Sequence, residues 1–330
     1  MIRNLTSVLM ICLFAFSLHA HAEAEGQSSV KMDDVQPQNK KNYMSGSEEI
    51  DDMITNANLR ALSGSKSKWS LATQFNYNGG SVGSPLSEDR PNIADTSGTT
   101  VKSDLDGSLW LKYNIDVKNS LMLGFGVRWI APLAKNGPSN YDGTTFDALN
   151  PEIQYQRLYK YFGIQAVLQA SLMQWTQADQ TAVGYAQQFN IDQENMYEFG
   201  ESGLSIGAST WVQYQTFNKS GSYGSASDPD NYISDLATVQ SQYAFFVAPV
   251  LEYEITDKLT FRTLVGLWQY EHYLSDRNPT GLIHDKIYQA IGFGISITRD
   301  IYLNPNVQFL PDDIRGDKTN VALNATINVF

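Results

Sequence analysis

Apolar and polar residues alternate with a period of two along most of the chain after Trp69. The clearest stretch has odd positions Val101, Ser103, Leu105, Gly107, Leu109, Leu111, Tyr113 and Ile115, and even positions Lys102, Asp104, Asp106, Ser108, Trp110, Lys112 and Asn114. Successive side chains of a strand point to opposite faces of a sheet. The pattern therefore predicts strands with one apolar face and one polar face.

The same alternation recurs often enough to predict about twelve strands. They are expected near residues 69–77, 100–115, 120–133, 151–161, 163–176, 190–200, 203–217, 237–256, 259–274, 286–298, 301–311 and 319–330. Short connections between these runs alternate with long polar ones. An even number of antiparallel strands, with both ends on the short-turn side, is typical of a transmembrane up-and-down β-barrel.

A bilayer explains why such strands would close into a barrel. Lipid offers no hydrogen-bond partner to the backbone, so a sheet can cross only if no edge remains unpaired. A crossing takes about 9 to 11 tilted residues, which most of the runs supply. A soluble periplasmic β-sandwich or jelly roll also alternates and is the alternative fold, but its turns would not sort by length into two sets.

The N-terminal residues differ from the rest of the chain. Residues 1–22 have the form of a signal peptide, with Arg3, an apolar stretch from Leu5 to Leu18 and a small-x-small cleavage site ending at Ala22. Residues 23–67 are polar and are expected to form a periplasmic extension. A capping box at Ser45 and helical spacing of apolar residues predict one short helix over about 46–62 within it. The barrel would then occupy residues 68–330.

Composition narrows the class of protein. Charged residues are 18% of the chain and aromatic residues 12%, and the sustained apolar run lies at the N-terminus. A helical channel or transporter would need several apolar runs of about 20 residues, so that class is excluded. The single cysteine, Cys12, lies in the signal segment, so no disulfide is expected in the exported protein.

The net charge argues against one class of partner. It is −12 for the full chain, and loss of Arg3 with the signal would make it −13. An acidic protein of this kind is not expected to bind nucleic acid.

The polar phase of the strands predicts the residues that would face the lumen. The candidates for lining a pore are Lys102, Asp104, Asp106, Lys112, Arg128, Glu252, Glu254, Arg262, Trp268 and Lys286. They carry both signs of charge, so two interpretations stay open. The lumen is either a charged constriction that admits small hydrophilic solutes by passive diffusion, or the filled interior of a closed structural or adhesive barrel with functional outer loops. The predicted helix would either plug the lumen or lie free.

Catalysis is the third and least favoured hypothesis. Outside the signal segment the chain has two histidines, His272 and His284, with Glu271 and Asp285 as neighbours. An acid/His pair for a surface hydrolase is conceivable there, but no motif of an outer-membrane hydrolase accompanies it. We therefore expect no enzyme activity and no catalytic residues, and neither a cofactor nor a metal site.

These features together resemble Gram-negative outer-membrane β-barrel proteins of the twelve-stranded, porin-like class. The resemblance rests on the signal segment, the twelve alternating runs, the sorted turns and a last strand that ends in Asn-Val-Phe330. It covers about residues 69 to 330. It implies a location in the outer membrane, contact with membrane lipid and lipopolysaccharide, and recognition of Phe330 and its strand by the barrel-insertion machinery.

Overall fold

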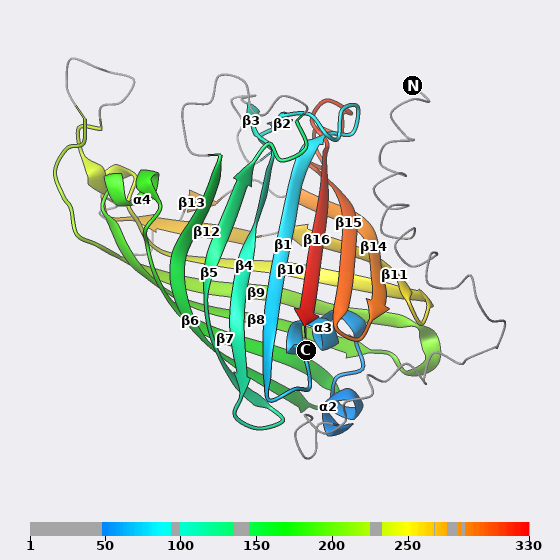
Figure 1. The fold of residues 1–330 in the computed structure, drawn as a ribbon. Coiled ribbons are helices and arrows are strands. Elements are labelled where there is room, and N and C mark those ends of the chain that lie inside the picture. Colours follow the sequence, from blue (N-terminus) through cyan, green and yellow to red (C-terminus); the bar gives the residue numbers. More distant parts are fainter. Residues whose placement is uncertain are drawn as a thin grey trace.

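The protein folds into one closed barrel of twelve antiparallel strands (Figure 1). The computed structural model describes residues 48–93, 100–134, 145–224, 233–266, 268–275, 283–284 and 288–329. The predicted fold class, an all-β up-and-down barrel of about twelve antiparallel strands, is confirmed. The predicted signal peptide, the start of the polar extension and Phe330 lie outside the described residues.

The strands of the wall follow one another around the ring in chain order. They are β1 (Trp69–Ser81), β4 (Asp104–Asn114), β5 (Asn119–Ile130), β6 (Phe146–Tyr161), β7 (Ile164–Gln174), β8 (Tyr185–Glu198), β9 (Leu204–Phe217), β10 (Ser241–Thr256), β11 (Leu259–Gly266) with β12 (Trp268–Tyr273), β14 (Tyr288–Thr298), β15 (Ile301–Phe309) and β16 (Asn320–Val329). β11 and β12 both pair with β10 and fill one position of the ring, and β13 (Ile283–His284) pairs with β12.

Pairing between the first and last strands closes the sheet. β1 pairs with β16 from Leu71 opposite Val329 to Ser81 opposite Asn320. β10 pairs with β11, which pairs in turn with β14. Every position of the ring therefore has hydrogen-bonded neighbours on both sides. Closure gives the backbone N–H and C=O groups of the strands hydrogen-bond partners within the sheet, as a wall surrounded by hydrocarbon requires.

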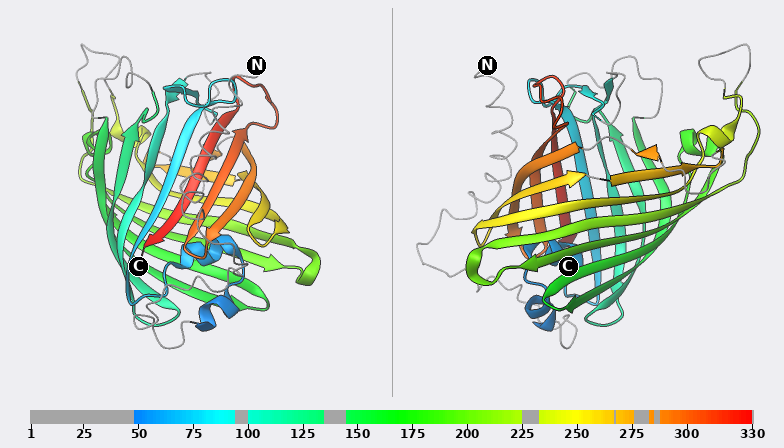
Figure 2. Two further views of the ribbon diagram at one scale, coloured as in Figure 1. Left: turned by 45° about the vertical axis from the view of Figure 1, so that its right-hand side comes forward. Right: turned by 180° about the vertical axis from the view of Figure 1, so that it is seen from behind.

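Short turns join the strands at one end and long connections join them at the other (Figures 1 and 2). The long connections carry most of the smaller elements. These are the β2 (Asp89–Pro91) and β3 (Thr100–Lys102) hairpin, α4 (Ala178–Ala182) and the 3₁₀ turn η4 (Leu236–Thr238), whereas the 3₁₀ turn η3 (Gly200–Ser202) lies in a short connection.

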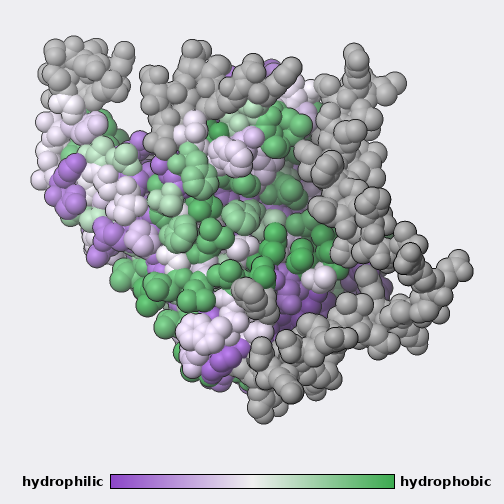
Figure 3. Space-filling view, in the orientation of Figure 1, coloured by the Kyte–Doolittle hydropathy of each residue, from purple (hydrophilic) through white to green (hydrophobic). Residues whose placement is uncertain are grey.

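The wall is apolar outside and polar inside. On β4, Leu111 is 48% exposed on the outer face, whereas its neighbour Lys112 is 1% exposed on the inner face. Leu123 on β5, which is 63% exposed, pairs with Leu111 and with Ile153 on β6. Hydrophobic residues cover much of the strand wall in Figure 3. This arrangement reverses that of a soluble protein and matches a barrel whose outer face contacts lipid.

Aromatic side chains gather at both ends of the outer face. At the short-turn end, Trp69 packs on Tyr113 with ring centroids 4.6 Å apart. Toward the long loops, Trp129 and Tyr214 are 46% and 47% exposed. Two such belts are typical of a wall that crosses two membrane–water interfaces.

Two irregularities shift the alternation away from the sequence-based prediction. β6 begins at Phe146, whereas the sequence predicted a start near residue 151. Its register with β5 shifts between Gly124 and Gly126, so the inward-facing residues of β6 change from odd to even positions there and the alternation is interrupted. β12 resumes after Gly266 with Gln269 opposite Phe246. Even-numbered residues were predicted to face inward over 259–274. This is correct for β11, whereas in β12 the odd-numbered residues face inward.

The predicted helix over 46–62 is two helices. α2 (Glu48–Met53) and α3 (Ala57–Ser63) are separated by residues 54–56, and α3 ends at Gly64. Asn56 causes the break, because its extended backbone and its side chain, which accepts from Leu59 N, form an N-cap. None of the helices in the described ranges is long and apolar enough to span a bilayer.

The apolar outer wall generates a test of what surrounds it. Leu123→Arg should lower the free energy of unfolding in phospholipid vesicles by about 2–4 kcal/mol, because it moves a charge from water into hydrocarbon. The matched control is Ile314→Arg, at a position that is 65% exposed in the connection between β15 and β16. Urea titration in vesicles measures both. Equal and small effects of the two substitutions would contradict a lipid-facing wall.

Candidate functional site

The candidate site is the lumen together with the segment 48–67 that enters it, which we call the plug. α3 contacts β7 on one wall and β14, β15 and β16 on another. In the ring of twelve, β7 and β15 are six positions apart and lie opposite each other. The plug therefore reaches across the lumen at the short-turn end, where Figure 1 shows α3.

Polar side chains of the wall bind the backbone of the plug where its helix is interrupted. Gln165 on β7 accepts hydrogen bonds from the Thr55 and Asn56 backbone amides at 2.8 and 2.9 Å. Thr55 Oγ1 donates to Glu198 on β8 at 2.6 Å. The gap between α2 and α3 thus becomes a docking point, because its unpaired backbone donors meet acceptors of the wall.

The end of α3 is held by a second set of wall residues. Lys112 on β4 donates to the Ser63 carbonyl and, at 2.7 Å, to Gln156 Oε1 on β6. Gln156 Nε2 donates to the Leu62 carbonyl at 2.8 Å, and Asn328 Nδ2 on β16 donates to the Ala61 carbonyl at 2.8 Å. These donors satisfy carbonyls that a helix C-terminus leaves without partners.

An apolar contact accompanies these hydrogen bonds. Ile50, Ile54 and Leu59 of the plug are at most 5% exposed. They pack in one cluster with inward-facing wall residues, which are Leu158, Val167, Met196 and Val250. Each plug side chain contributes about 1.5–3 kcal/mol by leaving water. The inner wall therefore carries an apolar patch at the level of the plug.

A buried charge cluster lies where α3 meets β10 and β11. Arg262 forms an ion pair with Glu252, and its second nitrogen lies 3.9 Å from Glu194 Oε2 on β8. Asn56 Nδ2 donates to the other oxygen of Glu252 at 2.6 Å. Glu252 thus links the plug to the charged group of the wall. Removal of Arg262 would leave the buried Glu252 carboxylate with Asn56 as its donor, and removal of Glu252 would leave Arg262 with the more distant Glu194, so either change is expected to be destabilising.

A second polar region lies closer to the long connections. Arg128 Nε lies 3.5 Å from Asp104 Oδ2, and Asp106 accepts from Asn78 Nδ2 at 2.8 Å. These residues and Glu152 border a cavity of about 380 Å³. The carboxylates outnumber the cations among these four charged residues.

At the short turn between β14 and β15, an ion-pair network holds the start of the plug. Asp51 accepts from Arg299 Nε at 2.8 Å and lies 2.5 Å from Lys66 Nζ. Burial works to raise the pKa of Asp51, but the charges of Arg299 and Lys66 and their hydrogen bonds hold it below its usual 3.8. Arg299 also binds Asp300, whose pKa is raised by burial, and the Gly64 carbonyl.

The candidate lining residues fall into distinct places. Asp104, Asp106, Lys112, Arg128, Glu252 and Arg262 take part in the contacts described above. Glu254 is exposed near the short-turn end of β10. Lys102 lies in β3, outside the ring, and forms ion pairs with Glu88 and Asp89 at 3.3 and 2.8 Å. Lys286 and the side chain of Trp268 lie outside the described residues.

Of the two histidine candidates for catalysis, the structure describes the side chain of His272. Its ring is buried and stacks on Tyr243 with centroids 4.5 Å apart. The neighbouring Glu271 accepts from the Tyr273 hydroxyl at 2.7 Å. The side chain of His284 and all of Asp285 lie outside the described residues. No three His, Cys, Asp or Glu side chains of the described ranges gather as metal ligands would.

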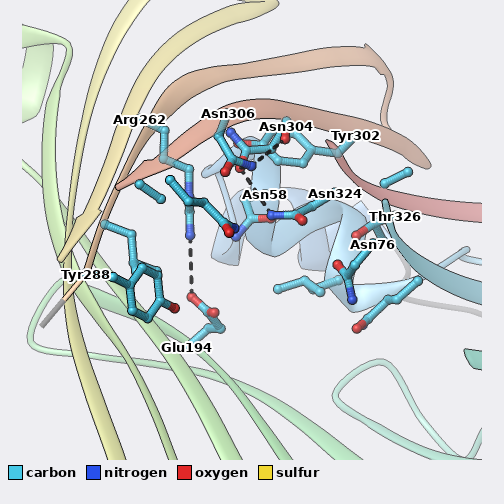
Figure 4. Close-up of a pocket in the computed structure, with 16 residues that line it drawn as sticks. Asn58, Asn76, Glu194, Arg262, Tyr288, Tyr302, Asn304, Asn306, Asn324 and Thr326 are labelled. Atoms are coloured by element: carbon cyan, nitrogen blue, oxygen red, sulfur yellow. Dashed lines mark hydrogen bonds and ion pairs between the residues drawn. The ribbon is translucent and has the colours of Figure 1, made fainter. Parts of the chain in front are cut away.

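Sequence reasoning missed a wall of amide side chains. Asn76 on β1, Asn304 and Asn306 on β15, and Asn324 on β16 face one cavity above α3 (Figure 4). The signal was present in the sequence, since amides recur at even positions of residues 301–311 and 319–330. The predicted lining residues were mostly charged, so these amides were not among them.

No family model and no curated protein matches the sequence of this chain. Among solved structures, the chain is similar to an outer membrane channel from Pseudomonas putida F1, with 9% identity over 80% of this chain and 96% of that one and a TM-score of 0.47. It is also similar to the NanC porin, with 9% identity, 78% and 97% coverage and a TM-score of 0.37. Salmonella typhi OmpF gives 8% identity, 81% and 99% coverage and a TM-score of 0.35.

The Asp51 network predicts how plug docking depends on pH. A carboxyl whose pKa is lowered on docking stabilises the docked state above its usual pKa of 3.8, and this contribution is lost as the pH falls through the lowered value. Asp51→Asn at pH 7 should speed hydrogen exchange of plug peptides by roughly two- to fivefold, since the pair is partly exposed. The adjacent exposed Asp52→Asn is the control. Hydrogen exchange is measured by mass spectrometry at pH 7 and at a pH below the lowered pKa of Asp51. The rates are corrected for the intrinsic exchange rate at each pH, and the difference between wild type and Asp51→Asn should disappear at the lower pH. Equal rates in the two variants would contradict the role of Asp51.

Proposed function

We propose that the protein is an outer-membrane pore for small hydrophilic solutes and that the plug closes its short-turn end in the conformation seen here. The observation that carries the proposal is the inner surface between the plug and the long connections. It is lined by charged and amide side chains and contains the cavities described above. A lumen that served only to stabilise the barrel would gain more from close apolar packing than from polar cavities.

The outer-membrane location is supported by the wall itself. Its apolar face, its two aromatic belts and the closure of the ring through β1–β16 and β10–β11 suit hydrocarbon on the outside. Passage would proceed by diffusion past the lumen side chains, with no chemical step. Twelve strands give a ring between filled eight-stranded barrels and open porins of 16 to 18 strands, which suits small solutes.

The plug is suited to leave the lumen without unfolding of the barrel. It is joined to the wall sequence only at its C-terminal side, where residues 64–68 lead into β1. Its polar bonds to the wall go largely to wall side chains such as Gln156, Gln165 and Glu252, and the described ladder of the ring does not include it. Undocking would therefore break no pairing between wall strands.

The plug also favours the competing function, a closed barrel whose long connections act at the cell surface. Bilayer conductance separates the two. Deletion of residues 48–63 should convert rare or small current steps into frequent, stable ones, because it removes the segment that crosses the lumen. The matched control replaces Asp52 and Lys118, two charged residues outside the plug–wall contacts described here, with Asn and Gln.

A cross-linked variant tests the gate without a deletion. Thr55→Cys with Gln165→Cys places thiols at two residues that contact each other, and Cys12 lies in the predicted signal segment. A short bis-methanethiosulfonate cross-linker, which joins the two thiols through disulfides, should abolish residual conductance, and reduction of these disulfides should restore it. Either single-cysteine variant should not respond. A barrel that stays silent without its plug would establish the closed form, and one that conducts equally with the plug locked would refute gating.

A further inference from the structure

The cavity above α3 has a composition unlike that of the rest of the lumen. It measures about 220 Å³ and takes its wall from β1, β14, β15 and β16, its floor from α3, and its far side from β8 and β11 (Figure 4). Amides are the most frequent polar side chains of the lining and come from Asn58, Gln74, Asn76, Asn304, Asn306, Gln308 and Asn324. Each amide offers both donors and an acceptor.

The amides of β15 and β16 order one another. Asn304 Nδ2 donates to the Phe293 carbonyl at 3.0 Å, which fixes the orientation of this side chain. Its Oδ1 then accepts from Asn306 Nδ2 at 3.3 Å and from Asn324 Nδ2 at 3.4 Å. The wall is therefore held in one arrangement before any solute arrives, which reduces the entropy lost on binding.

Asn306 is left with an unused acceptor. The residue is 5% exposed, and its Nδ2 is engaged by two oxygens of Asn304. Its buried Oδ1 has no hydrogen-bond partner among the described residues. A buried carbonyl oxygen without a partner costs free energy, so a hydroxyl donor that reached it would be bound favourably.

The charged side of the cavity carries no excess positive charge. Among the described residues, Arg262 and Glu194 are the charged groups that line the cavity, and Arg262 is paired with Glu252. An anion would meet the Glu194 carboxylate and an arginine that is already paired. An apolar solute would strip water from the amides without replacing their hydrogen bonds.

We propose that this cavity is a binding subsite for a small neutral polyhydroxylated solute, of the size of a monosaccharide, on the route through the barrel. The inference rests on the proposed function and specifies its solute class. The volume is below the roughly 300 Å³ at which sites for drug-sized ligands begin. Hydroxyl groups both donate and accept, so they complement the amide wall, including Asn306 Oδ1, and they bring no charge to the Arg262 cluster.

Three pyranose sugars of similar size but different charge test the proposal. The purified full-length protein in detergent micelles is dialysed to equilibrium against labelled D-glucose, D-glucuronate or D-glucosamine. Glucose should be retained more than either charged analogue. Asn306→Leu, which is close in size but lacks polar atoms, should weaken glucose binding about fivefold, the effect expected for one hydrogen bond.

Two further variants keep the test specific. Gln188→Leu removes an amide that lines the other lumen cavity and should leave glucose binding unchanged. Asn306→Asp keeps the shape and the acceptor but adds a negative charge, so it should shift the preference from glucose toward glucosamine. This shift would not follow from mere loss of folding.

Defined outcomes would overturn the inference. They are the absence of glucose binding to the wild-type protein, a preference of the wild-type protein for glucuronate or glucosamine, or equal losses in Asn306→Leu and Gln188→Leu. Conductance of the plug-deleted protein separates the two proposals. Current steps without sugar binding would reject the subsite alone, whereas sugar binding without current steps would reject the pore and leave the subsite.

Discussion

The closed ladder of backbone hydrogen bonds is the constraint from which the rest of the structure follows. Pairing of β1 with β16 and of β10 with β11 closes the ring, so the backbone groups of its strands find partners inside the sheet. The two faces of the wall are then free to serve different surroundings. Leu123 and its outward neighbours can face hydrocarbon, while Lys112 and Gln156 lie inside at 1% exposure.

Polar residues inside a barrel need partners of their own, and the plug supplies many of them. The Lys112 amine is taken out of water, and it is stabilised because the end of α3 presents the Ser63 carbonyl to it. The apolar patch around Val167 and Met196 likewise cannot face lipid, and it is covered by Ile54 and Leu59. Plug and inner wall are thus complementary in both hydrogen bonding and packing.

The side chains that hold the plug also border the amide-lined cavity. Asn58 of α3 forms part of its floor, while Arg262 contacts Glu252, which binds Asn56. A solute in the cavity and a docked plug would therefore act on a common set of groups. In such an arrangement occupancy of the cavity and undocking of the plug are coupled wherever the solute binds the two states with different free energies.

The sequence by itself determined the number of strands, the sorting of the turns and which side of most strands is apolar, because these properties follow from a period of two that each strand carries alone. It also placed a helix before the barrel. It did not determine the break at Asn56, the change of phase in β6 or the one between β11 and β12, since a cap and a register shift depend on the pairing of neighbours. Only the tertiary structure decided that the helix lies across the lumen and that amides from β1, β15 and β16 meet above it, because closure of the sheet brings together residues that are more than 200 positions apart in the chain.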